Sequence, residues 1–154
     1  MTPAAEPPAW TVSVDPLTFA IGIAHVQLER ALGKRFSVYA GPSLRCFDGI
    51  LAATNGPWTA YGAEVGVRGF FTGSAPEGAW GMVRGFLAAA STKDAPGAVK
   101  PAGYASALVG YTAILGSGLV LSGGAGVSWF DYGAGGQGVH GFAPAAHTNV
   151  GWAF

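Results

Sequence analysis

Residues 26–44 read VQLERALGKRFSVYAGPSL, and this stretch decides the fold. Apolar and polar side chains alternate on both sides of the turn residues Gly33-Lys34-Arg35. Before the turn, Val26, Leu28 and Leu32 oppose His25, Gln27 and Glu29; after it, Phe36, Val38, Ala40 and Leu44 oppose Ser37, Tyr39, Ser43 and Arg45. A period of two residues is that of a β-strand. The stretch therefore predicts two antiparallel strands joined by a short turn.

The same alternation recurs along the rest of the chain, in segments of about ten residues separated by turn signals. We predict strands over 10–20, 23–32, 36–47, 60–71, 79–91, 103–115, 119–131 and 142–154. The first is expected to bulge at Asp15-Pro16, where proline cannot donate a ladder hydrogen bond, and the fifth carries Arg84 on the same face as Trp80. The expected fold is all-β, an eight-stranded antiparallel up-and-down transmembrane β-barrel over 10–154, with a flexible segment at 1–9.

Composition restricts the class of protein further. Hydrophobic residues make up 50% of the chain and charged residues only 10%, against about 25% charged residues in soluble domains. The eight basic and eight acidic residues cancel, so no charge field favours nucleic acid as a partner. Glycine, at 26 residues, disfavours long helices, and the single Cys46 cannot form an internal disulfide.

A pair of membrane helices is the alternative for residues 101–130, which contain no charged side chain. The interval is long enough for a transmembrane helix of about 20 residues. Seven glycines interrupt it, however, and Gly116-Ser117-Gly118 at its centre is typical of a tight turn. Because both halves alternate with period two, we expect two strands instead.

The polar face of the expected strands is the sparser one, and we assign it to the barrel interior. Much of it is glycine and serine, which suits the crowded interior of an eight-stranded barrel. The predicted interior polar network consists of His25, Gln27, Glu29, Arg45, Glu64, Arg68, Arg84, His147 and Asn149. Its charges nearly balance, so we expect glutamate–arginine pairs inside.

Aromatic residues cluster near the expected strand ends, as they do in the two girdles of membrane barrels. The predicted membrane-interface aromatics are Trp10, Phe36, Phe47, Tyr61, Phe71, Trp80, Trp129, Trp152 and Phe154, with Phe19, Trp58, Tyr104, Tyr132 and Phe142 added at the second rim. Connections alternate between short ones at 33–35, 72–78 and 116–118 and long ones at 48–59, 91–102 and 132–141. This alternation is typical of short periplasmic turns and longer outer loops.

Two stretches resemble bacterial outer-membrane barrels. The C-terminal AHTNVGWAF, residues 146–154, has Thr148, Val150, Trp152 and Phe154 at alternate positions, and it resembles the signal that the barrel-assembly machinery reads in such proteins. Residues 26–44, preceded by VDPLTFAIG at 14–22, are similar to a strand–turn–strand hairpin of small outer-membrane barrel families. With eight expected strands, the chain also resembles the OmpA membrane domain, by analogy and not by matching residues. The resemblance implies an outer-membrane location after removal of a signal peptide, with outer-membrane lipids and the assembly machinery as partners.

The sequence contains no phosphate-binding loop, zinc-spaced cluster or nucleophile elbow, so we expect no catalytic residue, metal or cofactor. The leading hypothesis is a non-enzymatic structural or interaction barrel with a filled interior, whose outer loops contact an unknown partner. The alternatives are a narrow channel or small apolar-ligand transporter, which small interior residues such as Gly66, Gly110 and Gly124 would favour, and a soluble lipocalin-like binder. A lipid A-modifying enzyme is less favoured, because His147-Thr148-Asn149 is similar to the His-x-Ser-Asn stretch of a lipid A deacylase but lacks the serine.

Overall fold

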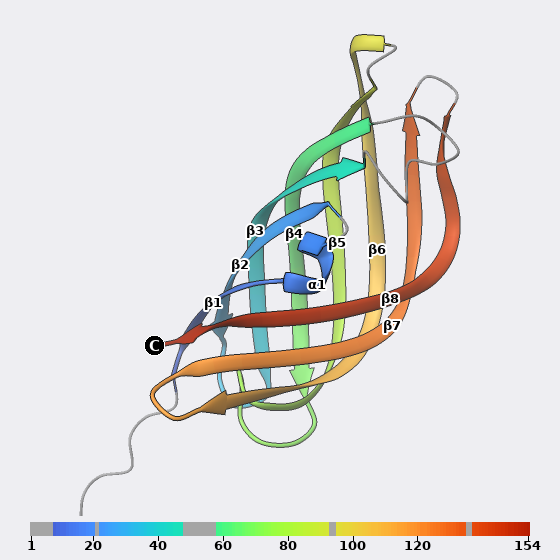
Figure 1. The fold of residues 1–154 in the computed structure, drawn as a ribbon. Helices are drawn as coiled ribbons and strands as arrows, with labels where there is room; N and C mark the ends of the chain where they lie inside the picture. Colours follow the sequence, from blue (N-terminus) through green and yellow to red (C-terminus); the bar gives the residue numbers. More distant parts are fainter. Residues whose placement is uncertain (1–7, 21, 48–57, 93–94, 135–136) are drawn as a thin grey trace, which may run out of the picture.

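The computed structural model of the chain is a β-barrel with one short helix (Figure 1). It describes residues 8–20, 22–47, 58–92, 95–134 and 137–154. The elements are β1 (Trp10–Val14), α1 (Pro16–Ala20), β2 (Ile23–Ala31), β3 (Phe36–Phe47), β4 (Trp58–Phe70), β5 (Gly78–Thr92), β6 (Ala95–Leu115), β7 (Leu119–Ala134) and β8 (Gln137–Ala153). Most of the expected flexible segment, residues 1–7, lies outside the described residues.

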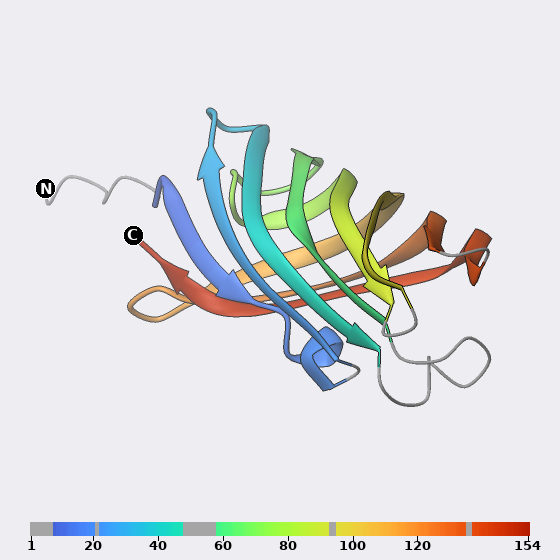
Figure 2. The ribbon, with the colours of Figure 1, turned by 90° about the horizontal axis from the view of Figure 1, so that it is seen from above.

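Each strand pairs antiparallel with its neighbour in the chain, and β1 pairs with β8 to close the ring. Figure 2, seen from above, shows the strands following one another around a common interior. The prediction of an all-β, eight-stranded antiparallel up-and-down barrel is therefore confirmed. Over the residues that β1 and β8 pair, closure removes the open edges that a flat sheet of this size would expose.

Alternation along each strand divides the side chains into an outer and an inner set. Apolar side chains point outward: Val65 is 56% exposed and Leu87 81% exposed. Their sequence neighbours Glu64 and Phe86 are buried inside the barrel. The division follows from the strand period of two, which sends successive side chains to opposite faces of the sheet.

The first predicted strand is much shorter than expected. β1 ends at Val14, and residues 16–20 form α1 where we expected a bulged strand to continue. Asp15 Oδ1 accepts hydrogen bonds from the backbone N–H groups of Leu17 and Thr18, each at 3.1 Å. Aspartate is a preferred N-cap, and proline suits the first helical position because its missing N–H would be unpaired there. Asp15-Pro16 thus starts a helix.

Two of the three predicted long loops are largely strand. In the loop predicted at 91–102, β5 continues to Thr92 and β6 already begins at Ala95. In the loop predicted at 132–141, β7 continues to Ala134 and β8 begins at Gln137. Residues 48–57 of the third predicted loop lie outside the described residues. In Figure 1 the strands β5 to β8 rise well beyond β1 and α1, so the wall of the barrel is uneven in height.

Residues 101–130, for which helices were the alternative, form most of the β6–β7 hairpin. The turn lies at 116–118, where Gly116 and Gly118 have φ angles of 54° and 132° that favour glycine. Among the described residues there is no helix with the length and apolar character needed to cross a membrane.

Candidate functional site

All nine residues of the predicted polar network point into the barrel, where they form two clusters around Glu29 and Glu64. Arg84 is the most exposed of the charged members, and only 9% of its side chain is accessible. The two glutamates face three arginines from β3, β4 and β5 (Arg45, Arg68 and Arg84). Buried charges require partners, and each cluster supplies them within the same ring of strands.

Glu29 on β2 is the acceptor of the lower cluster. We call lower the end of the barrel with the short connections that follow β2, β4 and β6. Arg68 Nη1 donates to its Oε2 at 2.8 Å, which makes a close ion pair between β4 and β2. Thr11 Oγ1 and Gln27 Nε2 also donate to Oε2, at 3.3 and 3.4 Å, and Ser37 Oγ donates to Oε1. The Glu29 side chain thus accepts hydrogen bonds from four side chains, one of them a guanidinium.

His147 on β8 links the two clusters. Its Nε2 lies 2.7 Å from Arg68 Nη2 and its Nδ1 lies 3.4 Å from Arg84 Nη1. A neutral imidazole has one acceptor nitrogen, so the shorter contact identifies Nε2 as the acceptor from Arg68. Nearby, Asn149 Nδ2 donates to Gln27 Oε1 at 3.0 Å. The polar contacts described for His147 are to two arginines, where a hydrolase would need a nucleophilic hydroxyl.

Glu64 on β4 is the acceptor of the upper cluster. The hydroxyl of Tyr39 donates to its Oε1 at 3.0 Å, and the hydroxyl of Tyr104 donates to its Oε2. Arg45, Arg84 and His25 approach the same carboxylate more loosely, with nitrogen–oxygen distances of 3.6 to 3.7 Å. The carboxylate is therefore held by two phenols, with two guanidinium groups and an imidazole around it.

Aromatic rings pack against the arginines of this cluster. The guanidinium carbon of Arg45 lies 4.0 Å from the centroid of Phe86 and 4.6 Å from that of Tyr104. The rings of Phe86 and Tyr104 stack with their centroids 5.7 Å apart. Cation–π contacts of this kind strengthen when the cation is removed from water.

Trp80 corrects the prediction that it is a membrane-interface aromatic. It lies inside the barrel with 0% of its surface exposed, and its Nε1 donates to Thr112 Oγ1 at 2.9 Å. The cause is on the facing strands: a Cβ at Gly110 or Gly124 would overlap the indole ring, so these glycines leave the space that Trp80 fills. The Trp80 ring thus fills the interior space for which Gly110 and Gly124 predicted a cavity.

Tyr104, expected at the second rim, is also buried inside. Tyr39 occupies the interior in a similar way, because it pairs with Gly66 across β3 and β4. A Cβ at Gly66 would overlap the Tyr39 ring, so glycine allows the ring to lie over β4 and its hydroxyl to reach Glu64. Cross-strand packing of an aromatic ring on a glycine is a known device for fixing strand register.

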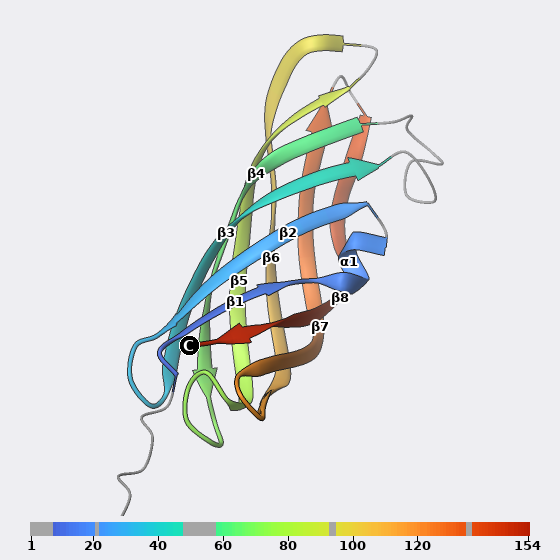
Figure 3. The ribbon, with the colours of Figure 1, turned by 60° about the vertical axis from the view of Figure 1, so that its left-hand side comes forward.

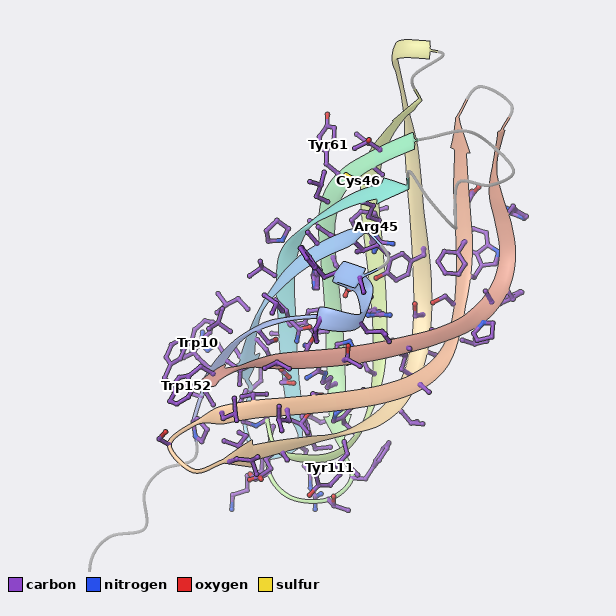
Figure 4. All side chains as sticks on the ribbon, in the orientation of Figure 1. Trp10, Arg45, Cys46, Tyr61, Tyr111 and Trp152 are labelled. Atoms are coloured by element: carbon purple, nitrogen blue, oxygen red, sulfur yellow. The ribbon has the colours of Figure 1, made fainter. Side chains whose placement is uncertain are left out.

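The remaining predicted interface aromatics whose side chains are described lie on the outside of the barrel: Trp10, Phe19, Phe36, Tyr61, Phe71, Trp129, Phe142, Trp152 and Phe154. Figure 4 shows Trp10 and Trp152 side by side at the end that carries the C-terminus, and Tyr61 toward the opposite end. The side chains of Phe47, Trp58 and Tyr132 lie outside the part of the chain that the structure describes. Among the described residues no group of three or more metal-binding side chains gathers at one place.

Comparison of the chain with protein-family models, with curated proteins and with solved structures finds no match. The site must therefore be interpreted from its own geometry.

Proposed function

We propose that this protein is an outer-membrane β-barrel of a Gram-negative bacterium with a non-enzymatic structural or interaction role and an interior closed by side chains. The observation that carries the proposal is the sidedness of the barrel. Large apolar side chains such as Val83, Val109 and Leu87 are exposed on the outside, whereas Glu29, Glu64 and Arg68 are buried. Hydrocarbon around a closed sheet favours this distribution, and water does not.

The extent of the exposed apolar surface supports a lipid environment. The strands β1, β2, β4, β5, β6, β7 and β8 each carry at least one outward apolar side chain that is 40% exposed or more (Val12, Val26, Val65, Val83, Val109, Val127 and Val150). Contiguous apolar patches on soluble monomers rarely exceed a few hundred Å². An apolar band that runs around the barrel is instead the surface that a bilayer covers.

The packed interior favours a structural role over a channel. Trp80, Arg68, Phe86 and His147 are among the largest fully buried side chains, and they come from β4, β5 and β8. Arg68, Trp80 and His147 contact one another in the lower half of the barrel, in keeping with the narrow interior of eight-stranded barrels. We expect the protein to act through its outer ends, with outer-membrane lipids around it and the barrel-assembly machinery reading its C-terminal strand.

The membrane proposal is tested by folding the purified chain into lipid vesicles and comparing boiled and unboiled samples on a gel. We expect the folded barrel to migrate differently from the boiled chain and to float with the vesicles. A chain that stays monomeric and dissolved in plain buffer, with one mobility, would exclude a membrane barrel and favour the soluble binder.

The closed interior is tested separately in planar bilayers. We expect no steady conductance from the wild-type protein, because Arg68 and Trp80 are buried across the lumen. The matched variant Trp80→Ala opens space in the same layer, so its conductance should exceed that of the wild type. Steady wild-type conductance at the level of this variant would favour the narrow channel instead.

A further inference from the structure

The barrel has a seam in its wall where the closing strand is too short. β1 pairs with β8 only from Thr11–Ala153 to Val14–Val150. Beyond that level β2 continues to Ile23 and β8 runs back to Gln137, and no strand of the described chain lies between them. Figure 3 shows α1 at this place, beside the ends of β1 and β2 and next to β8. The seam is the part of the wall above α1 in which no strand of the described residues joins β2 to β8.

Side chains replace a neighbouring strand along the β8 edge of the seam. The backbone N–H of Thr148 donates to Asp15 Oδ2 at 3.3 Å, and the carbonyl of Ala146 accepts from Arg84 Nη2 at 3.3 Å. Alternate residues of a strand turn their backbone groups to the same edge, so the next residue on this edge is Pro144, which has no N–H to satisfy. The edge is therefore adapted to stand without a strand beside it.

A cavity of about 150 Å³ lies behind the seam. Thr18, Ile23 and His25 line one side of it and residues 144–146 line the other. Its inner wall contains the cationic upper cluster, including Arg45, Glu64, Arg84 and Tyr104. A water molecule needs roughly 10–15 Å³ on this measure, so the cavity has room for a head group of several atoms.

An apolar groove of about 390 Å³ lies beside the seam on the outer surface. It is lined mainly by Val14, Pro16, Phe19, Ala24 and Val26, from β1, α1 and β2. Asp15 and His25 line both the groove and the cavity, so the two spaces adjoin. An apolar groove on the outer surface thus lies next to a charged cavity in the interior.

The two arginines that line the cavity, Arg45 and Arg84, are balanced in charge by Glu64 and Asp15, but both carboxylates already accept hydrogen bonds. Arg45 and Arg84 face one carboxylate, Glu64, whose oxygens already accept from Tyr39 and Tyr104. The other nearby carboxylate, Asp15, accepts hydrogen bonds from Leu17, Thr18 and Thr148.

One buried donor atom at the cavity also lacks an acceptor. Arg84 Nε has no hydrogen-bond partner although only 9% of its side chain is exposed. Buried polar atoms are normally paired, and a guanidinium presents a fork that matches a carboxylate or phosphate. Arg84 Nε is therefore a buried donor that an anionic head group in the cavity would satisfy.

We propose that the seam binds a single-chain anionic amphiphile from the membrane, with its head group between Arg45 and Arg84 and its alkyl chain in the groove beside Phe19. The proposal rests on the membrane location proposed above. The groove is apolar and continuous with the hydrocarbon that would surround the barrel, whereas the cavity supplies the cationic groups that a negative head requires. This assigns a ligand class to a barrel whose lower half is closed.

The test uses the full chain in zwitterionic phosphatidylcholine nanodiscs and dodecanoate labelled with ¹³C at its carboxyl carbon. A bound carboxylate should give a resonance distinct from that of dodecanoate dissolved in the bilayer, saturating at one per chain. Arg84→Gln should weaken binding by about tenfold or more, because it removes a charge-assisted hydrogen bond. The matched variant Arg30→Gln, on the outer face beside Trp10, should leave it unchanged.

A second variant, Ala145→Phe, keeps every charge and fills the cavity that Ala145 lines, so it should abolish the bound resonance. A resonance that persists in Ala145→Phe, or one unaffected by Arg84→Gln, overturns the site. Competition by acetate at equal concentration would show a free-anion site, and competition by neutral dodecanol would show that charge is irrelevant; either overturns the amphiphile proposal. A heat-modifiable barrel without a bound resonance fails this proposal alone, whereas a chain that never enters the discs fails the membrane proposal.

Discussion

Replacing Arg68 with methionine tests the ionic organisation of the interior most directly. Arg68 is 1% exposed, and its guanidinium contacts Glu29 at 2.8 Å and His147 at 2.7 Å. Methionine has a similar shape without charge, so the substitution leaves the buried carboxyl group of Glu29 without its cationic partner. Removing one partner of a buried ion pair costs about 3–5 kcal/mol. Since Glu29 keeps neutral donors from Thr11, Gln27 and Ser37, we expect a loss of about 3 kcal/mol, at the lower end of that range.

The assay is urea unfolding of the protein in lipid vesicles, followed by tryptophan fluorescence, with gel mobility confirming that each variant is folded. The double variant Glu29→Gln/Arg68→Met removes both charges and should be more stable than Arg68→Met alone, because no isolated charge remains. Arg30→Met on the outer face should change the unfolding free energy by no more than about 1 kcal/mol. A loss below about 1 kcal/mol for Arg68→Met, or a double variant less stable than the single one, would refute the ion-pair argument.

Three further substitutions probe packing and capping. Gly66→Ala should destabilise the protein by about 1–3 kcal/mol in the same unfolding assay, because the added Cβ overlaps the Tyr39 ring. Gly85→Ala is the control and should be tolerated, because the nearest atom to its Cβ is 3.8 Å away. Equal losses of stability in the two variants would contradict this explanation. Trp80→Ala should cost about 3–5 kcal/mol by leaving a cavity beside two glycines, and a loss under 1 kcal/mol would mean that the ring is not packed there. Asp15→Ala removes the N-cap of α1 and should cost about 0.5–2 kcal/mol, with faster amide exchange at the helix and unchanged exchange in β3; protection of the helix equal to wild type would argue against the cap.

The strands with one cleanly apolar face were predictable from sequence. β3 was predicted with its observed ends, because Ser37, Tyr39, Ser43 and Arg45 mark its inner face and turn signals bound it. β5 was harder, since it is apolar on both faces and Trp80 shares its parity with Arg84. Trp80 points inward because Gly110 and Gly124, on two other strands, leave space for its ring. The alternation within β5 alone carries no information about these two glycines.

The membership of the polar site was easier to predict than its pairing. The sequence predicted interior positions for Glu29 and Arg68, but their contact depends on the register that joins β2, β3 and β4. The seam was not predicted, because Asp15-Pro16 is compatible with both a strand bulge and a helix start. The two interpretations differ in whether β1 continues beyond Asp15. The pairing with β8 shows that it does not, because β1 forms only four residue pairs with β8, from Thr11–Ala153 to Val14–Val150.

The closure between β1 and β8 has a consequence for how the chain assembles. Every other strand pair joins neighbours in the chain, whereas Thr11 and Ala153 are about 140 residues apart. Bringing such distant segments together costs more chain entropy than forming a hairpin, by roughly 0.6 kcal/mol for each doubling of the loop. Local hairpins can therefore zip in sequence order, and the few residue pairs between the two termini form the slow, non-local step that completes the ring.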